Sequence, residues 1–174
     1  PDLAIGALAA VAPAIRPHLV VAGDVSADFA DYAAELDRLV DDLGLTGQVS
    51  FVGPQPRERL ARLMRDARIT LVPSHSETFG LVALEAEASG TPVIAASAGG
   101  LRESVAHGET GQLMDSREPA DWGRALTLLL TTPGLLARMG TVARVHARRF
   151  DWGWTARRLS ALYRGLLDDV AGHS

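Results

Sequence analysis

The chain turns from strand to helix within P-S-H-S-E-T-F-G-L-V-A-L-E-A-E-A-S-G, residues Pro73 to Gly90. An apolar run at 69–72 leads into this stretch, and residues 80–89 have the apolar spacing of a helix. The polar residues between them therefore lie at a strand-to-helix turn, which is where α/β folds place their ligands. Two carboxylates, Glu77 and Glu85, are separated by seven residues in this predicted site.

Strand-like and helix-like segments alternate on both sides of this turn. Apolar runs predict strands at 18–23, 48–53, 69–72, 91–96 and 111–115, and helical spacing predicts helices at 2–15, 29–43, 56–66, 80–89 and 101–106. The alternation predicts an α/β fold, a Rossmann-like doubly wound parallel sheet with helices on both faces. Beyond it we expect only helices: 119–130 and 133–149, each started by a proline, and a last helix from Trp152 with one apolar stripe, formed by Leu159, Leu162, Tyr163, Leu166, Leu167 and Val170.

The composition limits the chemistry of the chain. Its 174 residues, 47% of them apolar, suffice for one domain with a core or for half of a two-domain enzyme. Cysteine is absent, which excludes disulfides and thiolate metal sites, and the five histidines are too scattered for a metal cluster. The apolar runs are too short to span a bilayer and no signal-peptide pattern appears, so the expected location is cytoplasmic.

Charge is distributed unevenly along the chain. The net charge is -4, all 17 basic residues are arginine, and seven of them lie between Arg138 and Arg164 with a single acid, Asp151. This basic end is either a solvated helical face or a surface for an anionic partner or a further domain. Few aromatic residues interleave with the arginines and the rest of the chain is acidic, so we expect no nucleic-acid binding.

The predicted turn suits a ligand that carries both phosphate and hydroxyl groups. A helix start presents unpaired N–H groups and a partial positive charge, so Phe79, Gly80 and Leu81 offer a seat for phosphate oxygens. A phosphate would repel the carboxylate of Glu77, which is therefore better suited to accept hydrogen bonds from neutral hydroxyl groups. Eight residues of helix span about 12 Å, whereas the two carboxylates of a glycoside hydrolase are roughly 5–9.5 Å apart. The spacing therefore favours two carboxylates that bind different parts of one extended ligand over a hydrolase pair that acts on one bond.

Simpler interpretations of these residues stay open. Glu85 alone could be a surface charge, Glu77 could be favoured at a helix start by the dipole, and Gly99–Gly100 could only cap the next helix. Phe79 is expected in the core under either interpretation. An NAD-dependent oxidoreductase is disfavoured, because the turn after the 18–23 strand lacks the glycines of a dinucleotide-binding loop.

Part of the opening stretch and two later segments resemble a known family. The runs E-T-F-G-L-V-A-L-E, S-G-T-P-V-I-A and G-G-L-R-E-S-V-A-H-G-E-T-G-Q-L are similar to the C-terminal domain of retaining glycosyltransferases of GT-B architecture that use a nucleotide-diphosphate sugar. The resemblance covers nearly the whole chain. Within the family, the nearest likeness is to enzymes that transfer N-acetylglucosamine to inositol phosphate in mycothiol synthesis.

The resemblance implies a role for each residue of the site. Glu77 would be the catalytic residue that bonds the donor sugar, and Glu85 would bond the ribose of a UDP-sugar or GDP-sugar. The other expected donor-binding residues are Phe79, Gly80 and Leu81 at the helix start, Gly53 beside the base, and Gly99 and Gly100 near the phosphate. The family works without a metal, and the nucleophile is the hydroxyl group of the acceptor.

The resemblance also implies a domain division. Residues 1–150 would form the nucleotide-sugar-binding domain, and residues 151–174 a helix that crosses to an N-terminal acceptor domain. The strand and the Arg and Lys-Gly cations that precede this region in the family are absent from the sequence, so we expect a donor-binding half, inactive alone, that lacks its first strand. The alternative is a non-catalytic nucleotide-sugar-binding module or one that assembles through its last helix. Peripheral membrane contact and the oligomeric state stay open.

Overall fold

The computed structural model describes residues 1–24 and 30–172. In chain order its elements are α1 (Asp2–Ala9), β1 (Leu19–Ala22), α2 (Ala30–Asp42), β2 (Val49–Gly53), α3 (Arg57–Asp66), β3 (Thr70–Val72), α4 (Leu81–Ser89), β4 (Val93–Ala96), α5 (Leu101–Ser104), β5 (Gly111–Met114), α6 (Pro119–Thr131), α7 (Leu135–Ala147), the 3₁₀ turn η2 (Arg148–Phe150) and α8 (Trp152–Gly172). The predicted α/β fold with parallel strands is confirmed.

The strands form two parallel sheets. β1 pairs with β2, and β3, β4 and β5 form a three-stranded sheet with β4 in the middle. In the described part of the chain no hydrogen bonds join the two sheets. The single continuous sheet expected from the alternation is therefore divided between β1 and β3.

Helices cover both faces of the three-stranded sheet. All four residues of β4 are buried, and successive side chains point to opposite faces. Ile94 and Ala96 pack in one core with α1, α6 and α7, around the fully buried Trp122. Val93 and Ala95 pack in a second core with α3 and α4. A third core joins α1 and α2 to the β1–β2 sheet.

Some helix boundaries differ from the prediction. The first helix ends at Ala9 instead of residue 15, where the Arg16 guanidinium donates to the carbonyl oxygens of Val11 and Ala9 at 2.9 Å each. The helix expected from Pro133 begins at Leu135, because Gly134 has a left-handed φ of 72° that no helix residue can share. Pro119 does stand at the first position of α6, as predicted.

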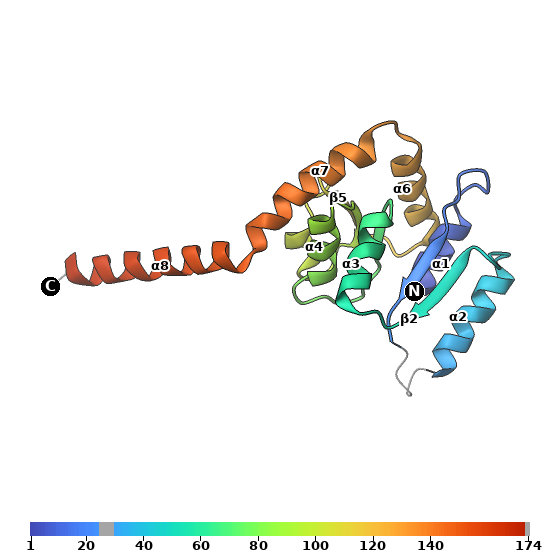
Figure 1. Cartoon of the computed structure of the whole chain (residues 1–174), viewed down its shortest axis with the longest axis horizontal. Helices are drawn as coiled ribbons and strands as arrows, with labels where there is room; N and C mark the ends of the chain where they lie inside the picture. The colour runs from blue at the N-terminus through green and yellow to red at the C-terminus, as the bar shows by residue number, and fades with distance from the viewer. Residues whose placement is uncertain (25–29, 173–174) are drawn as a thin grey trace.

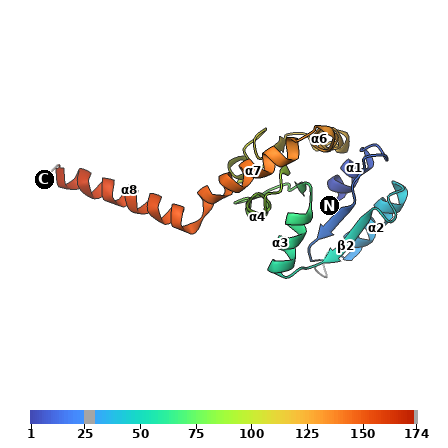
Figure 2. The same cartoon turned by 45° about the horizontal axis from the view of Figure 1, so that its top comes forward.

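The last helix extends away from the rest of the molecule. Figure 1 shows α8 projecting beyond α7, with the C-terminus far from the N-terminus, and Figure 2 shows the same arrangement from a second direction. Leu159, Leu162, Tyr163 and Leu166 are exposed along it. The remainder of the predicted stripe, Leu167 and Val170, lies outside the described side chains. No single helix within the described ranges has the length and apolar composition of a membrane span, although the bent pair Pro119–Thr131 and Leu135–Phe150 meets these criteria jointly.

Candidate functional site

Three loops meet at one edge of the sheet. Because β3, β4 and β5 are parallel, the loops that follow them leave at the same edge. The Gly100 N–H, after β4, donates to the Glu77 carbonyl oxygen at 2.8 Å. The Arg117 guanidinium, after β5, donates to the carbonyl oxygens of Pro73 at 3.1 Å and Ser74 at 3.3 Å. The structure therefore brings Glu77, Gly99 and Gly100 together at the start of α4.

The Glu77 carboxylate is held by the backbone just before α4. Its Oε1 accepts hydrogen bonds from the Gly80 N–H at 3.2 Å and the Phe79 N–H at 3.4 Å. Gly80 permits this turn because its φ is 69°, in the left-handed region. Two of the three N–H groups predicted to hold phosphate are thus engaged by Glu77 itself.

The third predicted donor remains available at the helix start. The first N–H groups of a helix have no intrahelical acceptor. In the ranges that the structure describes, no acceptor is recorded for the N–H groups of Leu81 and Val82. Of the N–H groups that the sequence predicts as phosphate donors, the Leu81 N–H is therefore the one left free within the described residues, and the Val82 N–H is free beside it.

Gly99 and Gly100 serve the close packing of two backbones. A Cβ on Gly100 would lie 2.5 Å from the Thr78 carbonyl oxygen, and one on Gly99 would overlap the Glu77 carbonyl oxygen. Gly99 also has a φ of 48°. Since the Gly100 N–H already donates to Glu77, a phosphate could accept from this N–H only if that bond broke. The pair shapes the loop that carries Glu77.

Exposed apolar side chains surround the start of α4. Phe79 is 70% exposed and Leu81 is 61% exposed. The prediction that Phe79 lies in the core is wrong, because the turn at Gly80 directs the buried face of α4 to Ala83, Ala86 and Glu87. The exposed side chains of Phe79 and Leu81 form an apolar rim at the start of α4, near Glu77 in the chain.

Glu85 lies on the exposed side of α4, in a pocket of about 360 Å³ between α3, α4 and α7. Arg57, Arg65 and Arg144 also line this pocket, and within the described residues no ion pair joins any of them to Glu85. Gly53 ends β2, in the other sheet, and α3 connects it to this pocket. Gly53 is not among the residues that line this pocket, and within the described residues no hydrogen bond joins it to Glu85.

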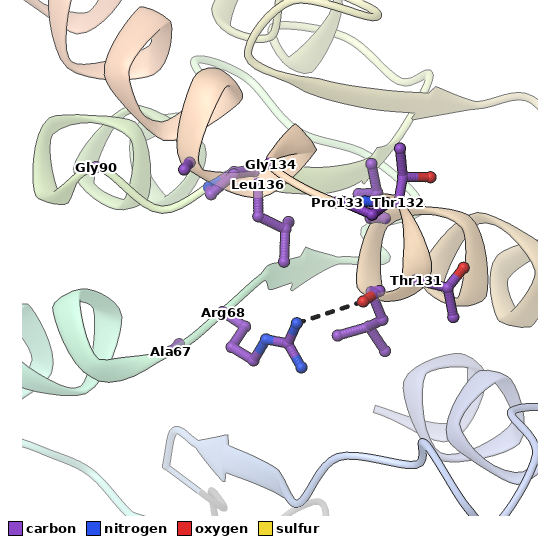
Figure 3. Close-up of a pocket in the computed structure, with 12 residues that line it drawn as sticks. Ala67, Arg68, Gly90, Thr131, Thr132, Pro133, Gly134 and Leu136 are labelled. Carbon is purple, nitrogen blue, oxygen red and sulfur yellow. Dashed lines mark hydrogen bonds between the residues drawn. The ribbon is translucent and has the colours of Figure 1, made fainter.

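A second pocket, larger than the one that contains Glu85, lies elsewhere. Its volume is about 590 Å³, and it is bounded by Ala67 and Arg68 before β3, Gly90 and Pro92 before β4, and the turn between α6 and α7 (Figure 3). Arg68 donates there to the Leu130 carbonyl oxygen at 3.4 Å. These residues precede the strands, so this pocket is at the opposite edge of the sheet from Glu77. No group of three metal-ligating side chains was found in the described part of the chain.

A buried polar cluster beneath α4 was missed by the sequence prediction. Glu87 is fully buried, and it accepts hydrogen bonds from the Thr110 hydroxyl at 2.5 Å and from His146 Nδ1 at 2.8 Å. Burial raises the pKa of the Glu87 carboxyl, outweighing the bonds from Thr110 and His146, which lower it. The spacing of Ala83, Ala86 and Glu87 at i, i+3 and i+4 was the available signal, since it places Glu87 on the buried face.

We expect Glu87 to make stability depend on pH. Its pKa in the folded protein is raised above the ordinary 4.5, so the folded state binds this proton more tightly than the unfolded chain. The stability that this proton adds to the folded state is therefore fully present below about pH 4.5, and it is lost as the pH rises through the raised pKa. Urea unfolding should be measured for the wild-type chain and for Glu87→Gln, whose side chain cannot titrate. As the pH rises, the unfolding free energy of the wild type should fall relative to that of Glu87→Gln. Parallel pH profiles would contradict this.

Comparisons with known proteins identify the family of the chain. Residues 1–146 match the family described as glycosyl transferases group 1. The chain is similar to the D-inositol 3-phosphate glycosyltransferase of Thermomonospora curvata, with 43% identity over 175 residues, covering 98% of this chain and 41% of that protein. The chain thus spans about two fifths of the length of the curated relatives that it matches.

Solved structures share the fold. Anabaena Alr3699/HepE in complex with UDP and glucose superposes with a TM-score of 0.84 and 28% identity, over 94% of this chain and 44% of that one. Sucrose-phosphate synthase from Thermosynechococcus elongatus superposes with a TM-score of 0.83 and 32% identity, over 97% of this chain and 42% of that one.

Proposed function

Because the chain belongs to the family of glycosyl transferases group 1, we propose that it is the part of a glycosyltransferase that binds a nucleotide-diphosphate sugar. The longer protein would transfer a hexose-type sugar to an acceptor hydroxyl, with retention of configuration and without a metal. The single observation that carries the proposal is the arrangement at α4: a carboxylate fixed by backbone N–H groups, a free helix start, and a second carboxylate about one turn further along the helix.

This arrangement suits the three parts of one extended ligand. Glu77 Oε1 is engaged by Phe79 and Gly80, which leaves its other oxygen to accept hydrogen bonds from sugar hydroxyls. The free N–H groups of Leu81 and Val82 would bind the diphosphate, supported by the helix dipole. Glu85, on the exposed face of α4, would accept hydrogen bonds from the ribose hydroxyls.

The same groups would assist the transfer step. As the bond between the sugar and the diphosphate breaks, negative charge grows on the departing phosphate oxygen, next to the start of α4. Donors already aimed at a developing charge stabilise it without reorganisation. The acceptor hydroxyl supplies the attacking oxygen, so no side chain of this chain needs to form a bond to the sugar.

We expect Glu85→Ala to weaken binding of the matching nucleotide sugar at least tenfold, since hydrogen bonds to a charged group are worth about 1.5–3 kcal/mol each. Isothermal titration calorimetry of the chain with UDP-glucose, UDP-N-acetylglucosamine and GDP-mannose would measure it. Glu35→Ala removes an exposed carboxylate on α2 and should bind as the wild type does. The proposal fails if the wild-type chain binds none of the three, or if Glu85→Ala binds with unchanged affinity.

A second candidate function is assembly through α8. Its exposed apolar side chains, Leu159, Leu162, Tyr163 and Leu166, favour a contact with another protein surface or a membrane surface. Sedimentation at several concentrations distinguishes a monomer from an assembly of copies, and flotation with lipid vesicles would detect membrane contact.

A further inference from the structure

Arg117 reaches across the edge of the three-stranded sheet. It lies between β5 and α6, and β4 separates β5 from β3. Its guanidinium nevertheless bonds three groups of the loop after β3: the Pro73 carbonyl at 3.1 Å, the Ser74 carbonyl at 3.3 Å and His75 Nε2 at 3.1 Å. One side chain thus ties the segment before Glu77 to the far strand.

The loop from Pro73 to Gly80 is held at two points. At its second half, the Gly100 N–H binds the Glu77 carbonyl, and the Glu77 side chain binds the backbone just before α4. At its first half, the contacts from Arg117 are the only hydrogen bonds recorded for residues 73–76 beyond strand pairing, within the described residues. Removing Arg117 would therefore free one half of the loop while the other half stays attached.

We propose that Arg117 is a positioning residue, which fixes the loop so that the free oxygen of Glu77 faces the sugar of the donor. The proposal rests on the proposed function, because it concerns the same site. Arginine suits this role: its planar fork is charged at all relevant pH values and donates to several acceptors at once. A lysine at this position would offer a point charge with a different direction and would replace only part of the contacts.

The test separates positioning from direct contact with phosphate. UDP carries the nucleoside and the phosphates but no sugar, so it does not engage Glu77. For Arg117→Ala we expect the Kd for UDP-glucose, measured by calorimetry, to rise five- to tenfold and the Kd for UDP to change less than twofold. Arg117→Lys should recover part of the loss. In a Glu77→Ala background, Arg117→Ala should have no further effect, because Arg117 acts through Glu77.

A second measurement needs no ligand. Amide hydrogen exchange of residues 74–76 should be at least fivefold faster in Arg117→Ala, with exchange in α6 unchanged. The control is Arg124→Ala, which removes an exposed arginine of α6 whose ion pair among the described residues is with Asp121. It should match the wild type in both measurements.

Three outcomes would overturn the proposal: unchanged exchange of the loop, equal weakening of UDP and UDP-glucose, or additive effects of the Glu77 and Arg117 substitutions. If the wild-type chain bound neither nucleotide, the proposed function would fail, and the exchange measurement would still decide whether Arg117 holds the loop.

Discussion

Replacing Gly99 with alanine is expected to lower the free energy of unfolding by about 2–4 kcal/mol and to abolish detectable donor binding. A Cβ at this position would overlap the Glu77 carbonyl oxygen, and overpacking typically costs about 1–3 kcal/mol. The positive φ of 48° adds about 1 kcal/mol for any side chain. Since the obstacle is backbone, it cannot rotate away, and the loop that carries Glu77 must move. Urea unfolding and calorimetry with UDP-glucose would measure the two effects.

Gly108→Ala is the matched control for this prediction. Gly108 also has a positive φ, 78°, but no atom lies within 4 Å of a Cβ built on it. The Gly108→Ala variant should therefore lose only the free energy that a side chain costs at positive φ, about 1 kcal/mol, and its affinity for the nucleotide sugar should stay unchanged. Equal losses in the two variants would show that the loops after β3 and β4 do not depend on this close approach.

Replacing His146 with alanine is expected to destabilise the chain by about 3 kcal/mol at neutral pH, as removal of one partner from a buried pair usually does. Its ring donates to the fully buried Glu87 and packs against Phe150, with ring centroids 5.2 Å apart. The loss would leave the carboxylate with Thr110 as its remaining side-chain partner. Urea unfolding would measure the change.

Two further variants separate the causes of that loss. His18→Ala removes an exposed histidine that bonds the Ser50 hydroxyl, and it should cost less than about 1 kcal/mol. Adding Glu87→Leu to His146→Ala should recover part of the stability, because an apolar side chain needs no partner in that cavity. A single His146→Ala variant as stable as the wild type would contradict the role of the buried pair.

The local order of the chain was predictable from its sequence. The helix and strand positions follow from apolar spacing, and the prediction places nearly every described element within one to three residues. Glu77, Gly80 and Glu85 became candidate site residues in the same way, because a strand, a polar turn and a helix follow one another within 22 residues, Ile69 to Gly90. These features depend on neighbouring residues and on the two periodicities of secondary structure.

Contacts between distant residues were decided only by the tertiary structure. Arg117 bonds Pro73 across 44 positions and His146 bonds Glu87 across 59, and no spacing rule connects such pairs. The division of the sheet, the exposure of Phe79 and the engagement of its N–H by Glu77 likewise follow from how the loops pack. The sequence by itself therefore determined where the carboxylates and the helix start lie along the chain. The packing of three loops at one sheet edge decided which of their donors and acceptors remain free for a ligand. The reason is that each hydrogen bond made within the fold occupies a donor and an acceptor that a ligand could otherwise use.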